Sequence, residues 1–220
     1  MHPAMHKLIK DILLLSPLRR RFLHVYNYYF TAAQLCFLGQ CIEETRGVSG
    51  SIAEVGVAAG MTTIFLNNYM DAQEIDKTYY AIDTFSGFVA KDVEFERAHR
   101  GKKRERYSSF QVNKKTWFDA SMQQNGITRV HSIEADVNEY DLASLGPLSF
   151  ALLDVDLYRP MKKALKELYS VLSPGGMIVV DDCDSSNVKW DGSDQAYKEF
   201  MEELGLAPEI FHQKLGIIRK

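Results

Sequence analysis

Five short apolar runs alternate with helix-like segments along most of the chain, and this alternation is the feature that most constrains the fold. A strand, a helix and a second strand in this order build a parallel sheet that helices cover on both faces. The sequence therefore predicts the α/β class, with a doubly wound and mostly parallel sheet. The expected strands are SIAEVGV, TYYAID, VHSIEAD, SFALLDVD and GMIVVDD, which begin at residues 51, 78, 130, 149 and 176.

The two ends of the chain differ from this middle part. Residues 1–47 are rich in aromatic side chains and show helical spacing, for example Leu35, Leu38 and Ile42. The last segments, APEIFHQ and KLGIIRK, predict an antiparallel hairpin that closes the sheet. No internal repeat interrupts the 220 residues. We therefore expect a single domain over 1–220, with an N-terminal helical segment at 1–47 and an α/β core at 48–220.

A helix is expected between the fourth and fifth strands. Pro160 suits its first turn, and the segment SPGG ends it. A right-handed crossover of this kind places the carboxyl ends of both strands at one edge of the sheet, as neighbours. The side chains expected to face the sheet are Met161, Ala164, Leu165, Leu168 and Leu172.

The connection at residues 86–118 is long, charged and poorly periodic, which is typical of a lid over an active site or of disorder. We expect this lid to be mobile without ligand. Its basic centre, residues 100–106, is interpreted as a solvated surface and not as a binding patch. Trp117 and Phe118 at its end either stack on a ring of the substrate or belong to the core.

Composition limits the kinds of partner that the protein is expected to bind and the cellular compartment that it suits. The net charge of −3 argues against a nucleic-acid partner, and no apolar stretch reaches the roughly 18 to 20 residues that span a membrane. Three cysteines without a CxxC motif suit a reducing compartment, so a cytoplasmic location is expected. The aromatic segment YNYYF at residues 26–30 either covers the site or pairs with another subunit in a homo-oligomer.

A glycine loop follows the first expected strand. Gly56 and Gly60 separate that strand from the next helix, and Thr62 and Thr63 occupy the first turn. The second strand ends in Asp83, at the spacing where an acid contacts ribose hydroxyls in dinucleotide-binding folds. The loop and the acid together predict a ligand that carries a ribose.

The loop lacks the features that phosphate binding requires. Residues 57–59 replace the middle glycine of a dinucleotide loop, and no Gly-Lys-Ser/Thr run is present. The site therefore suits a nucleoside without phosphate, of which S-adenosylmethionine is the common example. Glu54 would favour its positive sulfonium, and Asp136, at the end of the third strand, would accept the adenine amino group or would be a surface acid.

Four carboxylates are expected at one edge of the sheet, because they lie at the ends of two neighbouring strands. Successive side chains of a strand point to opposite faces, so Asp154 and Asp156 are expected to share one face. Buried like charges raise one another's pKa or require a counter-ion. Oxygen donors without a His or Cys cluster favour Mg²⁺. In the alternative reading, the acids cap helices or pair with the nearby cations Arg159, Lys162 and Lys163. The four acids are Asp154, Asp156, Asp181 and Asp182.

Three stretches resemble the macrocin O-methyltransferase family over roughly residues 48–184: IAEVGVAAGMTT, AIDTFSGF and LLDVDLYRPMKKALKELYSVLSPGGMIVVDDC. The resemblance implies a Rossmann-like class I methyltransferase fold and a magnesium-dependent enzyme that transfers methyl from S-adenosylmethionine to a small-molecule hydroxyl, mainly on a sugar. It implies Asp154, Asp181 and Asp182 as metal ligands, with Asp154 also beside the cofactor, and Asp156 as the base.

Two other functions are compatible with parts of the sequence. The strand ALLDVDLY also resembles the nucleophile strand of haloacid-dehalogenase-type phosphatases, with Asp154 as nucleophile. That reading leaves about the first 150 residues, including the glycine loop and Asp83, without a role. A catechol-type O-methyltransferase of the same fold is the nearer alternative.

Overall fold

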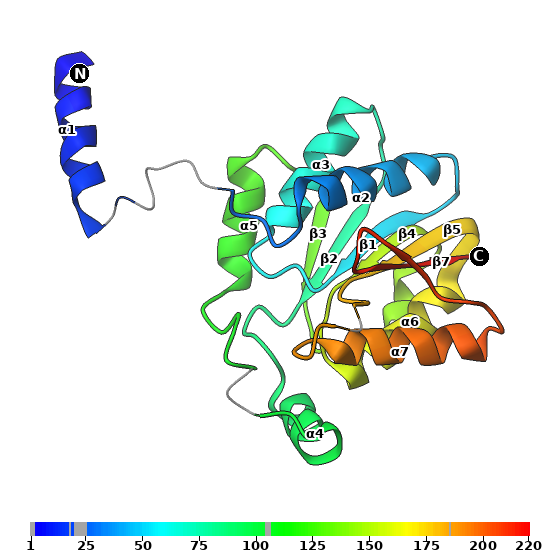
Figure 1. Cartoon of the computed structure of the whole chain (residues 1–220). Coiled ribbons are helices and arrows are strands. Elements are labelled where there is room, and N and C mark those ends of the chain that lie inside the picture. The colour runs from blue at the N-terminus through cyan, green and yellow to red at the C-terminus, as the bar shows by residue number, and fades with distance from the viewer. Residues whose placement is uncertain (1–2, 18, 20–25, 104–106, 185) are drawn as a thin grey trace.

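The computed structural model describes residues 3–17, 19, 26–103, 107–184 and 186–220. A sheet of seven strands in the order β3-β2-β1-β4-β5-β7-β6 forms its centre (Figure 1). β1 to β5 are parallel, and β7 runs antiparallel to both β5 and β6. This topology confirms the expected α/β class and the closing hairpin. The strands are β1 Ser51–Val55, β2 Tyr79–Asp83, β3 Val130–Glu134, β4 Leu148–Leu153, β5 Leu172–Val180, β6 Glu209–Phe211 and β7 Leu215–Arg219.

Helices cover both faces of the sheet. In Figure 1, α2 and α3 cover one face and α6 and α7 the other, while α4 projects beyond the sheet and α1 lies apart. Among the described residues, no helix is long and apolar enough to cross a membrane. The helices are α1 Pro3–Leu15, α2 Ala32–Glu44, α3 Met61–Ala72, α4 Ala90–Arg100, α5 Lys115–Gln124, α6 Tyr158–Val171 and α7 Asp191–Glu203, with a short 3-10 helix at Leu142–Leu145.

The core lies in two layers on either side of the central strands. Phe150 and Val179 point into the layer beneath α2 and α3, whereas Ala151 and Ile178 point into the layer beneath α6 and α7. All six residues of β4 are buried. Because both faces are covered, these strands are apolar on both sides, and this is why they appear in the sequence as continuous apolar runs.

The boundary between α6 and β5 differs from the prediction. Leu172 was expected in the helix, but it begins β5, and the predicted strand start at residue 176 was four residues too late. Leu148 pairs with Leu172 and Phe150 with Met177, so residues 173–176 form a bulge in the strand. A β-bulge at a strand end accommodates the Pro and Gly residues that were expected to end the helix.

The N-terminal segment is helical only in part. α1 and α2 confirm the helical spacing, but residues 26–31 between them are not helical, and residues 18 and 20–25 lie outside the described part. Thr31 caps the start of α2: its side chain accepts a hydrogen bond from the Gln34 amide, and the Gln34 side chain accepts one from the Thr31 amide. This capping box fixes the start of the helix.

The lid segment contains a helix that the sequence did not predict. α4 has little apolar surface, and its turns are linked by the ion pairs Arg97 to Glu94 and Arg100 to Glu96. Periodicity of apolar residues does not detect such a helix, because charge pairs at i,i+3 and i,i+4 support it instead. α5 occupies the end of the segment from Lys115 onward.

Hydrogen bonds and ion pairs connect the middle of the lid segment to the rest of the protein. The Glu96 carboxylate accepts hydrogen bonds from the Tyr158 amide at 2.9 Å and from Arg100, and Arg100 also binds Asp191 at 2.8 Å. Lys102 binds the other oxygen of Asp191. The side chains of Arg100 and Lys102 are only 10% and 9% exposed and are paired, so the expectation of a solvated basic surface was wrong for these two. Residues 104–106 lie outside the described part.

Candidate active site

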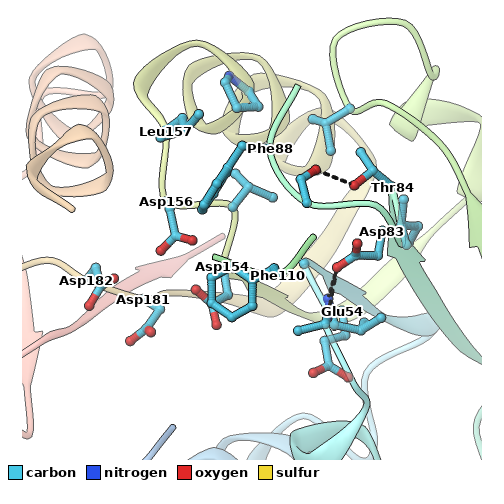
Figure 2. Close-up of a pocket in the computed structure, with 18 of the residues that line it drawn as sticks. Glu54, Asp83, Thr84, Phe88, Phe110, Asp154, Asp156, Leu157, Asp181 and Asp182 are labelled. Carbon is cyan, nitrogen blue, oxygen red and sulfur yellow. Dashed lines mark hydrogen bonds between the residues drawn. The ribbon is translucent and has the colours of Figure 1, made fainter. Parts of the chain in front are cut away.

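A cavity opens at the carboxyl ends of β1, β2, β4 and β5, beneath the start of the lid. Figure 2 shows Asp154, Asp156, Asp181 and Asp182 gathered on one side of this cavity and Glu54 and Asp83 on the other. The carboxyl edge of an open α/β sheet is where such folds bind their ligands. Of the residues expected at the site from the sequence, those that line the cavity are Glu54, Gly56, Thr62, Asp83, Asp136, Asp154, Asp156, Asp181 and Asp182.

The glycine loop is held by Asp83. One carboxylate oxygen of Asp83 accepts the amides of Val57 and Ala58 at 2.9 and 2.8 Å, and the other accepts the amide of Phe85 at 2.7 Å. The loop amides that would bind a phosphate in a dinucleotide site are therefore already occupied. A carboxylate has about four acceptor positions, so Asp83 retains capacity for a hydroxyl.

Two of the expected ligand-binding residues lie behind the cavity wall. Gly60 begins α3 with φ of +83°, and a Cβ there would lie 2.8 Å from the side chains of Met122 and Phe118. Thr63 is fully buried, and its hydroxyl donates to Glu54 at 2.7 Å. Both residues support the wall and do not line the cavity.

Glu54 is a buried carboxyl group at the base of the cavity. One of its oxygens accepts hydrogen bonds from the hydroxyls of Thr63 and Tyr79, at 2.7 and 2.6 Å. Burial raises the pKa of Glu54 to about 7, and these two donors only partly offset that effect. Glu54 is therefore poised between its neutral and charged forms near neutral pH.

This raised pKa predicts a pH-dependent stability. Between pH 4.5 and about 7 the native state binds the Glu54 proton more tightly than the unfolded chain does, so the free energy of unfolding falls as the pH rises through that window. Glu54→Gln removes this contribution. The free energy of unfolding of the variant minus that of the wild type should therefore be about 2 to 3 kcal/mol more positive above pH 7 than at about pH 4.5. Urea unfolding at a series of pH values measures this, and parallel profiles for the two proteins would contradict it.

The four acids at the opposite side lie just beyond the ends of β4 and β5 and not within these strands. β4 ends at Leu153, so the strand alternation expected to place Asp154 and Asp156 on one face does not apply to them. Asp156 instead adopts the left-handed conformation with φ of +60°, and Asp182 after β5 does the same with φ of +57°. These turns bring carboxylate oxygens of Asp154, Asp156 and Asp182 within 4.8 Å of one another.

Asp181 does not belong to this group of three acids, and its carboxylate is held by Lys214. The Lys214 ammonium lies 2.7 Å from one carboxylate oxygen of Asp181 and 3.6 Å from an oxygen of Asp182. The second oxygen of Asp181 is buried and accepts no hydrogen bond. Asn187 donates to Asp182 at 3.3 Å. The acid cluster therefore keeps unused acceptor positions.

Burial and mutual repulsion raise the pKa values in this cluster. Burial is the largest cause for Asp154 and Asp156, and the neighbouring carboxylates add to it, so that both pKa values lie well above the usual range. Burial likewise raises the pKa of Asp181 to about 6, against the opposing effect of Lys214. Burial alone would lower the pKa of Lys214, yet the carboxylates around it leave that pKa raised.

The cations proposed as partners in the alternative reading are bound elsewhere. Lys162 pairs with Glu199, Lys163 with Glu167, and Arg159 lies 3.7 Å from Asp92. Lys214 takes their place, and sequence reasoning missed it because it lies in the turn of the final hairpin. The expected antiparallel pairing of that hairpin was the one signal that brings Lys214 to the sheet edge.

Lys214→Met should destabilise the protein in the absence of divalent metal, because it leaves Asp181 buried without its partner. We expect a loss of about 3 kcal/mol in the free energy of unfolding at neutral pH, and a smaller loss when magnesium is present. Denaturant unfolding in EDTA and in magnesium measures both values. Lys166→Met is the matched control, since its exposed pair with Glu203 should contribute less than about 1 kcal/mol. Equal effects of the two substitutions would contradict the assignment.

Aromatic side chains also line the cavity. Phe88, Phe110 and Trp190 line it, together with Tyr29 from the YNYYF segment, which confirms that this segment reaches the site. Of the two residues expected either to stack on a substrate or to be core, Phe118 is fully buried and Trp117 is 52% exposed outside the cavity.

The fold is that of class I methyltransferases, as comparison with solved structures shows. The O-methyltransferase NovP is 21% identical with a TM-score of 0.69, covering 85% of this chain and 79% of NovP. CalS11, described as a TDP-rhamnose 3'-O-methyltransferase of calicheamicin biosynthesis, is 19% identical with a TM-score of 0.61, covering 100% and 95%. An O-methyltransferase from Bacillus cereus, solved with SAH, is 13% identical with a TM-score of 0.55, covering 99% and 97%.

The family of the chain is shown by the match of its sequence to a family model. The family model of macrocin O-methyltransferase (TylF) matches residues 30–214, so the chain belongs to this family and is an O-methyltransferase. Neither the phosphatase reading nor the catechol-type reading gains support from these comparisons. A search of curated proteins found no significant match.

Proposed function

We propose that this protein transfers a methyl group from S-adenosylmethionine to a hydroxyl of a sugar or glycosylated natural product, with magnesium bound at the acid cluster. The observation that carries the proposal is one cavity that joins the Asp83-held glycine loop to the four carboxylates. The glycine loop suits a nucleoside without phosphate, and the four carboxylates suit a hard cation. The family membership supports a sugar hydroxyl as the acceptor.

The cofactor side uses residues at three strand ends. Asp83 has acceptor capacity for the ribose hydroxyls, and Asp136, whose side chain accepts the Asn138 amide at 2.9 Å, lies in the cavity wall for the adenine amine. Glu54 lies at the base, where a carboxylate favours the positive sulfonium. S-adenosylmethionine bound there would supply an electrophilic methyl group.

The metal side fits a magnesium ion by its donor chemistry. Only carboxylate oxygens converge there, and one oxygen of Asp181 is buried without a hydrogen bond. Asp154, Asp181 and Asp182 would hold the ion, which would lower the pKa of the acceptor hydroxyl and fix its position. Asp156 would accept the proton of that hydroxyl; burial and the neighbouring carboxylates raise the pKa of Asp156, which makes its carboxylate a stronger base than that of an exposed aspartate.

Calorimetric titration with S-adenosylhomocysteine, in magnesium and in EDTA, tests the proposal. We expect binding in both conditions, and Asp83→Asn should weaken it because the loop loses its anchor. The absence of binding in either condition would overturn the cofactor assignment. Methyl transfer to rhamnosides tests the acceptor class, and turnover that persists in EDTA would overturn the role of magnesium.

Three free cysteines support a proposed location in a reducing compartment such as the cytoplasm. Cys41 and Cys183 are buried, and Cys36 is exposed. An exposed thiol that is not paired persists best where disulfides are reduced.

A further inference from the structure

Three aromatic side chains that line the cavity, supported by a fourth behind them, form what we call the aromatic wall: Phe88, Phe110, Trp190 and the buried Tyr107. The ring of Phe88 lies at its centre, 5.6 Å from Trp190, 5.7 Å from Phe110 and 5.8 Å from Tyr107. Figure 2 shows Phe88 and Phe110 beside the acids Asp156 and Asp154. The wall thus borders the place where the acceptor hydroxyl is expected.

The wall is held in place by contacts on three sides. Trp190 directly precedes α7, whose second residue Gly192 approaches the Asp156 carbonyl so closely that a Cβ would lie 2.9 Å from it. Asp191 is fixed by Arg100 and Lys102 of the lid. The rings of Tyr107 and Trp190 lie 5.9 Å apart, which links the other end of the lid to the wall. Such preorganised aromatic surfaces lose little conformational entropy when a ligand binds.

The charges around the cavity select against an anionic acceptor. Among the described residues that line it, eight carry carboxyl groups and only Lys214 carries an ammonium, which is already paired with Asp181. The lid residues Arg100 and Lys102 are bound to Glu96 and Asp191. A diphosphate would therefore meet carboxylates without a free cation among these residues, whereas a neutral ring would meet aromatic faces.

We propose that the aromatic wall binds a flat, uncharged ring system attached to the sugar, so that the acceptor is a neutral aryl glycoside and not a sugar nucleotide. This inference rests on the proposed function, since it presumes a sugar hydroxyl at the acids. Aromatic contacts of this kind contribute beyond the burial of apolar area. Phe88 and Trp190 contact the ring directly, and Tyr107 positions them.

The test compares three rhamnosides by calorimetry with magnesium and S-adenosylhomocysteine present: the methyl glycoside, the 4-nitrophenyl glycoside and dTDP-rhamnose. We expect the 4-nitrophenyl glycoside to bind about tenfold more tightly than the methyl glycoside, and dTDP-rhamnose to bind most weakly. Phe88→Leu and Trp190→Leu should each remove most of that advantage. Trp117→Leu, which changes the other tryptophan of the chain outside the cavity, should keep it.

Several outcomes would overturn the inference. The inference is wrong if dTDP-rhamnose binds most tightly, or if the methyl and 4-nitrophenyl glycosides bind equally or not at all. It is also wrong if the 4-nitrophenyl glycoside keeps its advantage in both Phe88→Leu and Trp190→Leu. Titration of the wild type and each variant with S-adenosylhomocysteine alone distinguishes failure of the proposed function from failure of this inference. If the wild type does not bind S-adenosylhomocysteine, the proposed function is refuted; if it binds but shows no preference for the aryl glycoside, only the role of the aromatic wall is refuted.

Discussion

Asp156→Asn should lower kcat at least about 100-fold while the affinity for S-adenosylhomocysteine stays nearly unchanged. The amide keeps the shape of the side chain but takes up no proton from the acceptor hydroxyl. Asp156 lines the cavity beside the acids, whereas Asp83 and Asp136, proposed to contact the cofactor, belong to other strands. Single-turnover methyl transfer measures the chemical step, and calorimetry measures cofactor binding in the same variant.

The same variant also distinguishes a base from a metal ligand. The oxygens that lie within 4.8 Å of one another belong to Asp154, Asp156 and Asp182, and Asp181 is engaged by Lys214. If Asp156 is the base, magnesium affinity measured by calorimetry should change little in Asp156→Asn. A large loss of magnesium affinity would move Asp156 into the ligand set. Asp76→Asn, at an exposed residue that does not line the cavity, is the control for an Asp-to-Asn change.

The topology of the sheet could be read from the sequence because its strands are buried on both faces. β4 and the second half of β5 are nearly continuous apolar runs, and the crossover rule places β4 beside β5 with their carboxyl ends together. The convergence of the acids followed from this placement. The strand alternation invoked for Asp154 and Asp156 was nevertheless wrong, since a left-handed turn after β4 positions Asp156.

Contacts between distant segments could not be read in the same way. Lys214 reaches Asp181 from the final hairpin, 33 residues away, and no local pattern marks that lysine. The wall joins Phe88 to Trp190 across the lid and the sheet. Sequence reasoning therefore considered Trp117, which lies in the lid segment, and missed Trp190. Side chains brought together by tertiary packing alone leave no spacing in the sequence.

Gly56→Ala should abolish cofactor binding and reduce the free energy of unfolding by about 4 kcal/mol or more. Gly56 has φ of +91°, and a Cβ there would lie 1.8 Å from the carbonyl oxygen of Asp154. The glycine loop and the turn that carries Asp154 therefore touch through backbone, with no space for a methyl group. Relief of the clash requires the two segments to move apart, which displaces the cofactor loop from the acid cluster.

Gly126→Ala isolates the contribution of that contact. Gly126 also has a positive φ of +70°, but a Cβ there would meet nothing within 4 Å. Its substitution carries only the backbone strain, about 1 to 2 kcal/mol. Urea unfolding and S-adenosylhomocysteine titration of both variants give the difference. If Gly56→Ala is no more destabilising than Gly126→Ala and still binds the cofactor, then the close approach of the loop to Asp154 is not what joins the two halves of the site.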